Sequence, residues 1–374
     1  MEKPTSRVHF GEVRLRLLRF FGTFFIFLTV LIIASIIIII YLYRWIDSPP
    51  INRDPTRIPI VAGVDSLVNG TTIISIKQGE TAESVGLKLK ESGLIRSIFF
   101  WNLLARIDSA TIKAGTFQLQ AGASSIQIRE ILVLGKQLME RVTIPEGFTL
   151  KKIAELLERN GIVDSEDFLV AVRSPGLLQS YGIPATSLEG YLFPDTYFFP
   201  RDYPTPMVIK TMLDTFYRRL YEIAPEARII SQKELFEKII IASIVEREYR
   251  ADDEAPLMAG VFFNRLKIGM ALQSCATVEY VITEIQGKPH PEVLYNKDIE
   301  IKDLFNTYMY AGLPPGPISS PGITALKSAF NPIVSDYLYF RLVDPSEGRH
   351  QFSRTLGEHA EAGILYLKSD RTGK

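Results

Sequence analysis

The sequence predicts an α+β protein that combines a single N-terminal transmembrane helix, a small α/β module and a larger mixed α/β domain. Three observations predict this class: an uncharged apolar run near the N-terminus, a strand–helix pattern that occurs twice, and a long aliphatic helix that precedes loop- and strand-rich sequence. The 374 residues, 47% of them hydrophobic and 22% charged, are sufficient to bury a sizeable core. Basic and acidic residues number 42 each, and this balance gives no electrostatic reason to expect nucleic acid as a partner.

The predicted transmembrane helix covers residues 20–43, which contain no charged side chain. At about 1.5 Å per residue, a helix of this length spans a hydrocarbon core of about 30 Å. The tail before it, residues 1–19, carries the basic residues Lys3, Arg7, Arg14, Arg16 and Arg19. By the positive-inside tendency, we expect this tail in the cytoplasm and the rest of the chain on the outer side of the membrane.

Residues 44–70 contain several prolines among mixed polar residues, and they predict a stalk that leads into a strand at 71–76. The single cysteine, Cys275, cannot form an internal disulfide, so the outer part of the chain must be held together by its apolar core. We expect the Cys275 thiol to be a small packed side chain rather than a reactive group.

A pattern of turn, helix and stop occurs twice at a constant offset, at residues 77–95 and 145–163. The aligned pairs are Gly79/Gly147, Thr81/Thr149, Val85/Ile153, Leu89/Leu157 and Gly93/Gly161. Each copy predicts a strand, a glycine turn, a helix with a threonine N-cap, and a glycine stop. A looser third copy covers 121–137. Units of this kind suggest a LysM-like module over 71–140 that could hold a polysaccharide, and a purely structural spacer is an equally open alternative.

The larger domain is predicted over 141–365, followed by a tail at 366–374. Its aromatic and proline-rich segment 187–200 predicts a loop, because these residues do not suit a helix interior. The sequence SQKE at 231–234 is a capping box, with Ser231 as N-cap, and it predicts a helix that ends near Tyr249. A second helix is expected near 254–266, and strands and loops are expected in the last third of the chain.

Two glutamates, Glu246 and Glu248, lie at the end of the first of these helices. Residues three and four positions back lie on the same helix face, and for Glu248 these are Ile244 and Val245. Glu248 therefore projects from the aliphatic stripe. For Glu246 the residues four and three positions back are the small Ala242 and Ser243, so we expect Glu246 to be solvated and paired with Arg250, four residues ahead.

An acid among apolar neighbours holds its proton more tightly, because its anion is poorly solvated, so the pKa of Glu248 should rise from about 4.3 toward neutrality. A carboxyl that is protonated at working pH can act as a general acid on a glycosidic oxygen and can later take a proton back. The alternative is a buried Glu248 that forms an ion pair with an arginine such as Arg265 or Arg250.

Several further motifs occur in a fixed order along the chain. They are AGTFQL (114–119), PEGFTL (145–150), LEGYLFPDTY (188–197), IASIVEREYR (241–250), MAGVFFNRLKIGMALQS (258–274), NTYMYAGLPPGPISSPG (306–322), YLYF (337–340) and HQFS (350–353). This ordered set covers residues 72 to 360 and resembles the membrane-bound endolytic murein transglycosylase family (MltG/YceG-like). The resemblance implies a YceG-like catalytic domain over 141–365. It also implies that Glu248, the second acid of the S-I-V-E-x-E motif, is the catalytic residue.

The resemblance further implies a lyase on the outer face of the bacterial inner membrane that takes part in glycan strand termination. Such an enzyme cleaves the MurNAc–GlcNAc bond of nascent peptidoglycan strands internally and leaves 1,6-anhydro-MurNAc ends. The C6 hydroxyl of the muramic acid is then the nucleophile, so one carboxyl, Glu248, can serve as acid and then as base. The family alone implies penicillin-binding proteins as partners. No cofactor is implied, and no metal is expected, because the four histidines lack metal-ligand spacing.

Polar and aromatic side chains in the matched motifs are candidates to bind sugar hydroxyls, acetamides or ring faces. They are Glu189, Tyr191, Asp195, Tyr197, Asn264, Gln273, Thr277, Asn306, Thr307 and Tyr308. The chain departs from the family pattern at 274–277, where SCAT replaces the usual Thr-Asp-Pro-Thr, with Thr277 retained. Tyr249 stands where a small threonine is common, and VEY at 278–280 replaces an apolar–Tyr pair. These changes put substrate preference and rate in question more than the type of reaction.

Two other functions remain open from the sequence. One is a non-catalytic, membrane-anchored scaffold that binds peptidoglycan through the repeats. The other is a glycoside hydrolase with two carboxylates, in which Glu189 or Asp195 would be the second acid.

Overall fold

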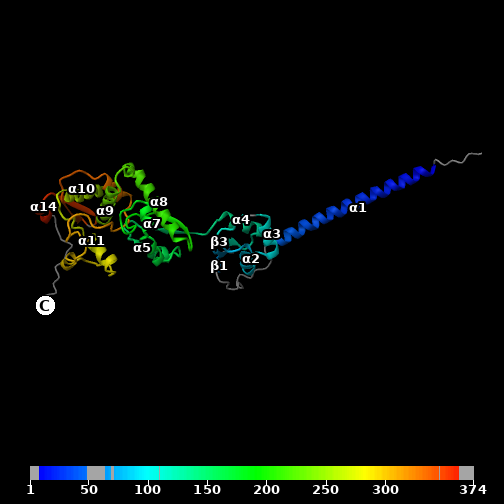
Figure 1. Ribbon diagram of the computed structural model, residues 1–374, viewed down its shortest axis with the longest axis horizontal. Helices are drawn as coiled ribbons and strands as arrows, with labels where there is room; N and C mark the ends of the chain where they lie inside the picture. The colour runs from blue at the N-terminus through cyan, green and yellow to red at the C-terminus, as the bar shows by residue number, and fades with distance from the viewer. Residues whose placement is uncertain (1–7, 49–63, 69–70, 109, 345, 362–374) are drawn as a thin grey trace, which may run out of the picture. The chain divides into compact units, whose positions relative to one another are not determined.

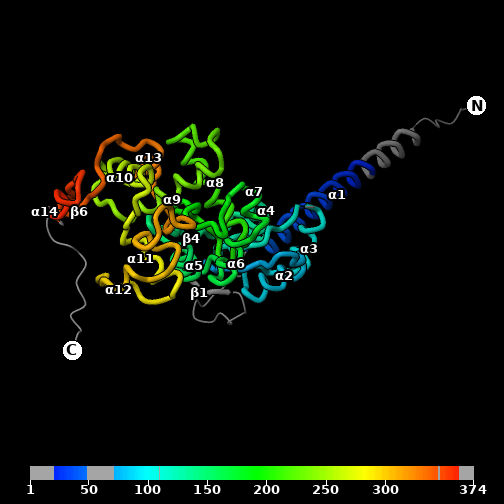
Figure 2. Tube along the Cα trace, turned by 60° about the vertical axis from the view of Figure 1, so that its left-hand side comes forward, coloured from blue at the N-terminus to red at the C-terminus, as the bar shows by residue number. Residues whose placement is uncertain are grey.

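The computed structural model describes residues 8–48, 64–68, 71–108, 110–344 and 346–361 (Figures 1 and 2). It divides into two compact units, Met1–Leu138 and Met139–Lys374. Lys3, Arg7, most of the expected stalk and the expected tail at 366–374 lie outside the described residues.

Helix α1 runs from Val8 to Asp47 and is longer at both ends than the expected span of 20–43. Its part from Phe21 to Asp47 is long and apolar enough to cross a membrane, and none of its most apolar stretch is buried within the protein. The hydroxyls of Thr29 and Ser35 donate to the backbone carbonyls four residues back, so these polar groups are satisfied within the helix. The helix is compatible with a single-pass membrane anchor.

The first unit contains a three-stranded antiparallel sheet of order β1-β2-β3, with β1 at Val64–Val68, β2 at Thr71–Ile76 and β3 at Gly115–Gln120. Its helices are α2 (Ala82–Glu91), α3 (Ile98–Ile107) and α4 (Ser125–Leu134). The core contains Ile74, Leu89, Trp101, Phe117 and Leu132. Strand β2 lies where it was predicted. The expected stalk at 44–70 is wrong at its end. Residues 64–68 form strand β1 and pair antiparallel with β2, although prolines and polar residues precede them.

The predicted repeat is confirmed by two copies of the same structure. In the first unit, strand β2 precedes helix α2. In the second unit, strand β4 (Met139–Thr143) precedes helix α5 (Leu150–Arg159). Thr81 and Thr149 both cap their helices by accepting a hydrogen bond from the backbone N–H three residues ahead. The turn glycines Gly79 and Gly147 have φ of +80° and +72°, which only glycine adopts without strain.

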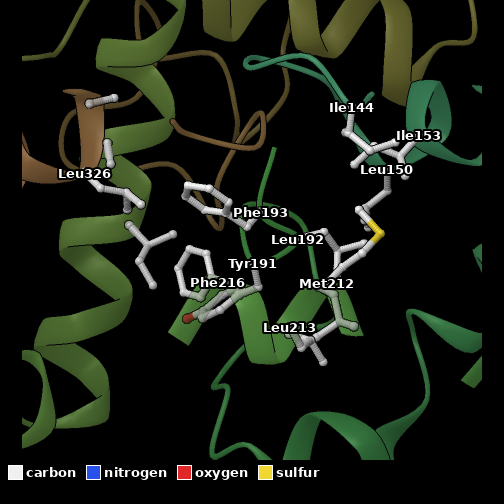
Figure 3. Packing of buried hydrophobic residues seen from close by; sticks show 14 of the residues in the cluster. Ile144, Leu150, Ile153, Tyr191, Leu192, Phe193, Met212, Leu213, Phe216 and Leu326 are labelled. Atoms are coloured by element: carbon white, nitrogen blue, oxygen red, sulfur yellow. The ribbon is translucent and has the colours of Figure 1, made fainter. Parts of the chain in front are cut away.

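The second unit is built around helix α9, Gln232–Glu248, whose stretch Ile239–Val245 is fully buried or nearly so. Helices α10 (Ala255–Lys267), α11 (Cys275–Tyr280) and α13 (Ile323–Phe330) pack against it. Ser231 caps α9 by accepting the Glu234 N–H, which is one half of the predicted capping box. Figure 3 shows part of the surrounding core, where Tyr191, Phe193 and Phe216 pack together.

The remaining elements surround this centre. They are α6 (Ser165–Ala171), α7 (Pro175–Ser180), β5 (Thr196–Pro200), α8 (Thr205–Ile223), a 3₁₀ turn (Pro225–Arg228), a second 3₁₀ turn (Asp252–Glu254), a π-helical turn (Val281–Ile285), α12 (Asn296–Ile299), the hairpin β6 (Tyr339–Asp344) and β7 (Arg349–Ser353), and α14 (Leu356–Glu361). The expected loop at 187–200 is wrong in its second half. There, β5 pairs antiparallel with β4, because its aromatic residues suit a half-buried strand.

Candidate functional site

Glu248 lies at the very end of helix α9, where the chain leaves the core. Ile244 and Val245, on the same face of the helix, are fully buried. The Glu248 carboxyl is partly buried beside them, and Tyr249 continues in an extended conformation. Glu248 thus lies on the aliphatic face of the helix, as the periodicity of the sequence predicted.

The Glu248 carboxyl is held by the segment that begins helix α11. The Ser274 hydroxyl donates a hydrogen bond to Oε1 of Glu248, and the Ala276 backbone N–H also bonds this carboxyl. Burial raises the pKa of Glu248 above its usual range, and the hydrogen bond from Ser274 acts in the opposite direction. The negative charge of Glu279 raises this pKa further. Burial and the charge of Glu279 therefore favour the protonated form of Glu248, and the hydrogen bonds from Ser274 and Ala276 favour the carboxylate.

Ser274 is itself fixed by a small network of buried polar groups. Its N–H donates to Thr307 Oγ1 at 3.0 Å, and the Thr307 and Thr277 hydroxyl oxygens are 2.9 Å apart. Gln273 donates its N–H to the Thr307 carbonyl at 3.1 Å and adopts a φ of +50°, which is strained for a residue with a side chain. Asn306, next to Thr307 in the chain, donates hydrogen bonds to the carbonyls of Ile299 and Ile301 and so fixes the segment that carries Thr307.

The neighbouring side chains explain why Glu248 is not locked in an ion pair. The guanidinium of Arg265 donates instead to the backbone carbonyls of Leu338 and Leu272, and Arg250 is exposed. Among the described residues, no ion pair joins Glu248 to an arginine. Cys275 Sγ lies 3.1 Å from the Tyr308 hydroxyl, and burial raises the pKa of this thiol to about 11, so it is protonated and packed.

An ion pair lies next to Glu248. Arg247 Nη2 is 2.8 Å from Glu279 Oε2, and this ion pair joins the last turn of α9 to α11. His290 Nε2 approaches the same Glu279 oxygen at 3.3 Å. The pair therefore holds together the two elements that carry Glu248 and Ser274.

Glu246 differs from the solvated residue that the sequence predicted. It is partly buried, and its Oε2 accepts the Gly322 N–H at 2.9 Å rather than pairing with Arg250. Burial raises the pKa of Glu246 to about 8, and the nearby charges of Glu146 and Asp252 add to the rise. The expectation was wrong because helix periodicity does not show that a distant loop, here at Gly322, covers this face.

The structure separates the sequence-predicted substrate residues into two groups. Gln273, Thr277, Asn306, Thr307 and Tyr308 lie around Ser274, next to Glu248. Tyr191 and Tyr197 are buried in the core, and Asn264 donates to the carbonyls of Ser335 and Tyr337.

The two remaining acids of the predicted set are also engaged within the fold. Glu189 accepts the Leu150 N–H at 3.2 Å with both oxygens, and burial raises its pKa to about 8. Asp195 accepts the N–H of Thr196 and lies 3.4 Å from Arg219.

Sequence reasoning missed the contributions of Ser274, Arg247 and Glu279. Ser274 and Glu279 were noted only as departures from the family pattern. The sequence contains a signal for Glu279 alone. Glu279 follows Cys275 by four residues, so the two side chains lie on the same face of α11.

Comparison with known proteins places these features in a family. Residues 74–363 match the model of the YceG-like family. The chain is 30% identical over 319 residues to an endolytic murein transglycosylase of Streptococcus pneumoniae (serotype 2, strain D39), covering 76% of this chain and 56% of that protein. It is 30% identical over 318 residues to an endolytic murein transglycosylase of Bacillus subtilis (strain 168), covering 80% of this chain and 86% of that protein.

The matched part of the chain thus spans somewhat more than half the length of the streptococcal relative. A crystal structure of a YceG-like protein from Listeria monocytogenes also matches, with a TM-score of 0.51 and 28% identity. The match covers 78% of this chain and 99% of the Listeria chain.

Proposed function

Because the chain belongs to the YceG-like family, we propose that it is an endolytic peptidoglycan lytic transglycosylase with Glu248 as its general acid and base. The substrate would be nascent glycan strands, cleaved at the MurNAc–GlcNAc bond to give 1,6-anhydro-MurNAc ends. The observation that carries this proposal is the Glu248 carboxyl itself. It ends a buried helix, has a raised pKa, and is oriented by Ser274 rather than neutralised by an arginine.

The proposed reaction needs only this one carboxyl. Protonated Glu248 donates its proton to the glycosidic oxygen as the bond from the muramic C1 to that oxygen breaks. The resulting carboxylate then takes the proton of the C6 hydroxyl as O6 bonds to C1, which restores the acid and consumes no water. The hydrogen bonds from Ser274 and Ala276 stabilise the carboxylate between these two steps.

The contacts of the two acids that the sequence offered as a second carboxylate favour a single-carboxyl mechanism over hydrolysis. Retaining and inverting hydrolases need two carboxylates about 5–5.5 Å or about 6.5–9.5 Å apart. The two candidates for a second acid are engaged elsewhere, Glu189 at the start of α5 and Asp195 beside Arg219. Glu246 accepts a backbone N–H from Gly322.

Residues around Ser274 are the proposed substrate contacts. Gln273 is exposed beside Ser274 and has a strained, positive φ, so we assign it to a sugar hydroxyl or acetamide. Tyr308 borders the same segment. Thr277, Asn306 and Thr307 are buried and hold the segment in place.

The first unit would act as the membrane-proximal part of the enzyme. Its copy of the repeat, β2 followed by α2, supports a LysM-like module that holds glycan, at residues 71–140. With α1 as anchor, the N-terminus would be cytoplasmic and the two units would lie outside the inner membrane. The family resemblance alone supports penicillin-binding proteins as partners.

Digestion of purified peptidoglycan with the full-length protein tests the function, with mass spectrometry of the new glycan ends. Wild type should produce anhydro ends, and Glu248→Gln should produce none. Glu237→Gln is the matched control, since Glu237 lies on the same helix with a side chain that is 45% exposed, and it forms an ion pair with Lys233 at 3.9 Å. Reducing ends would show hydrolysis instead, and binding without cleavage would favour the scaffold.

A further inference from the structure

The end of helix α1 is docked onto the first unit rather than joined to it by a free linker. The rings of Tyr43 and Phe100 meet edge to face, with centroids 5.6 Å apart. The guanidinium of Arg96 lies 5.3 Å from the ring centre of Trp45, and its Nε donates to the Ser48 carbonyl at 3.0 Å.

A further bond joins α1 to the start of α4, because the Ile126 N–H donates to Asp47 at 3.2 Å. Figure 1 shows α3 at the end of the module where α1 joins it. These contacts fix the position of α3 relative to the last turns of α1.

Helix α3 has a buried face and an exposed face that are both apolar. Phe100 and Trp101 are buried in the module, with Trp101 fully so. On the other face, Phe99, Leu103 and Ile107 are 79%, 40% and 74% exposed. Their spacing of four residues aligns them in one stripe along the helix. We call Phe99, Leu103 and Ile107 the α3 stripe.

We propose that α3 lies in the membrane interface, with the α3 stripe inserted into the outer surface of the bilayer. The proposal rests on α1 being a membrane anchor. The lipid-facing surface of that anchor continues up to Trp45, which is 53% exposed, and tyrosine and tryptophan mark the level of the lipid headgroups. Because Tyr43 contacts the residue next to Phe99, α3 begins at this level of the membrane.

The chemistry of the stripe favours lipid over other occupants. It presents one aromatic and two aliphatic side chains, and it offers no hydrogen-bonding group to a sugar. The exposed Arg106 adjoins Ile107 and suits a lipid phosphate. A short apolar helix beside a basic side chain is the pattern of an interfacial helix. Insertion would hold the module against the membrane at two points, α1 and α3.

Spin labelling of the full-length protein in liposomes tests this placement. Single cysteines are introduced by Phe99→Cys, Leu103→Cys and Ile107→Cys, labelled with a nitroxide, and probed with oxygen and a polar nickel chelate. Gln118→Cys, at an exposed position on β3, is the aqueous control, and Ile36→Cys on α1 is the lipid control. The native Cys275 thiol is partly buried and protonated, and labelling of the wild type measures its contribution.

We expect labels at 99, 103 and 107 to collide with oxygen more often than with the chelate, at shallower depth than position 36. Position 118 should show the reverse. If position 36 is in lipid but the stripe behaves like position 118, the proposal is wrong while the anchor stands. A stripe accessible to neither reagent would also overturn it, since protein would then cover the helix. If position 36 is aqueous, α1 is not an anchor, and the placement of the α3 stripe fails with it, whereas the proposed reaction at Glu248 is decided by the peptidoglycan digest.

Discussion

The hydroxyl of Ser274 donates a hydrogen bond to Oε1 of Glu248, which joins the segment before α11 to the last turn of α9. This bond stabilises the carboxylate form of Glu248, whereas burial stabilises the protonated form. In the proposed reaction Glu248 would first give and then accept a proton, which needs both influences, and the balance between them can be tested.

Replacing Ser274 by alanine should raise the pKa of Glu248 further and slow the reaction. Loss of a hydrogen bond to a charged group costs roughly 1.5–3 kcal/mol, so we expect kcat to fall by about 10- to 160-fold. The alkaline limb of the pH–rate profile should move to higher pH, because Glu248 stays protonated longer. Ser274→Thr retains the hydroxyl and should keep the profile of the wild type. An unchanged profile in Ser274→Ala would exclude this role.

Glu279 and Arg247 should shift the same profile in opposite directions. The charge of Glu279 raises the pKa of Glu248 and that of Arg247 lowers it. Glu279→Gln should therefore move the alkaline limb to lower pH, and Arg247→Gln should move it to higher pH. Glu292→Gln, at an exposed position on the loop that follows His290, is the control for charge removal. If both variants only lose activity, with no movement of the limb, the ion pair has a purely structural role.

Glu189 and Glu246 should make the second unit less stable as pH rises. Each has a folded pKa of about 8 against a usual value of 4.5, so the folded protein binds more protons than the unfolded chain between these values. Their stabilising effect is full below about pH 4.5 and is lost as pH rises through 8. The slope is about 1.4 kcal/mol per pH unit for each carboxyl.

Chemical denaturation at several pH values measures this slope. Glu189→Gln and Glu246→Gln should each flatten the decline of the unfolding free energy with pH. Equal slopes in wild type and both variants would show that neither carboxyl is protonated in the folded protein.

Gly260→Ala should destabilise the second unit, because a Cβ at this position would lie 2.3 Å from the carbonyl oxygen of Ile333. That oxygen belongs to the backbone, so relief requires the 333–337 segment to shift. Overpacking of this kind costs about 1–3 kcal/mol, which a melting curve detects. Gly122→Ala is the control, since no atom lies within 4 Å of its Cβ. Equal melting temperatures for the two variants would contradict the close packing.

The predictions from sequence succeeded where the signal was local. The Ser231 cap, the course of α9 and both copies of the repeat depend on residues a few positions apart. The failures depend on distant partners. Strand β5 exists because β4 pairs with it, and Glu246 is covered by Gly322, which lies 76 residues further along the chain. A single sequence contains no signal for such contacts.

The same difference between local and distant signals applies to the candidate site. Periodicity identified Glu248 as the acid on the aliphatic face. Its partner Ser274 lies 26 residues away and became evident only when the fold placed α11 beside α9. The expectation that Cys275 is packed agrees with its contact to Tyr308.

The two copies of the repeat differ in what their turns face. Gly79 has no atom within 4 Å of a Cβ position, whereas Gly147 lies against Arg247 and Glu246 and donates its N–H to Ser320. The first turn thus requires glycine at Gly79 only for its positive φ, with no neighbouring atom for a side chain to meet. The other forms part of the wall beside the proposed active site, so mutations in it would be constrained by chemistry as well as by folding. The two copies of the repeat can therefore be compared within one protein. Substitutions that the first turn tolerates and the second does not would show what the proposed site requires beyond the fold.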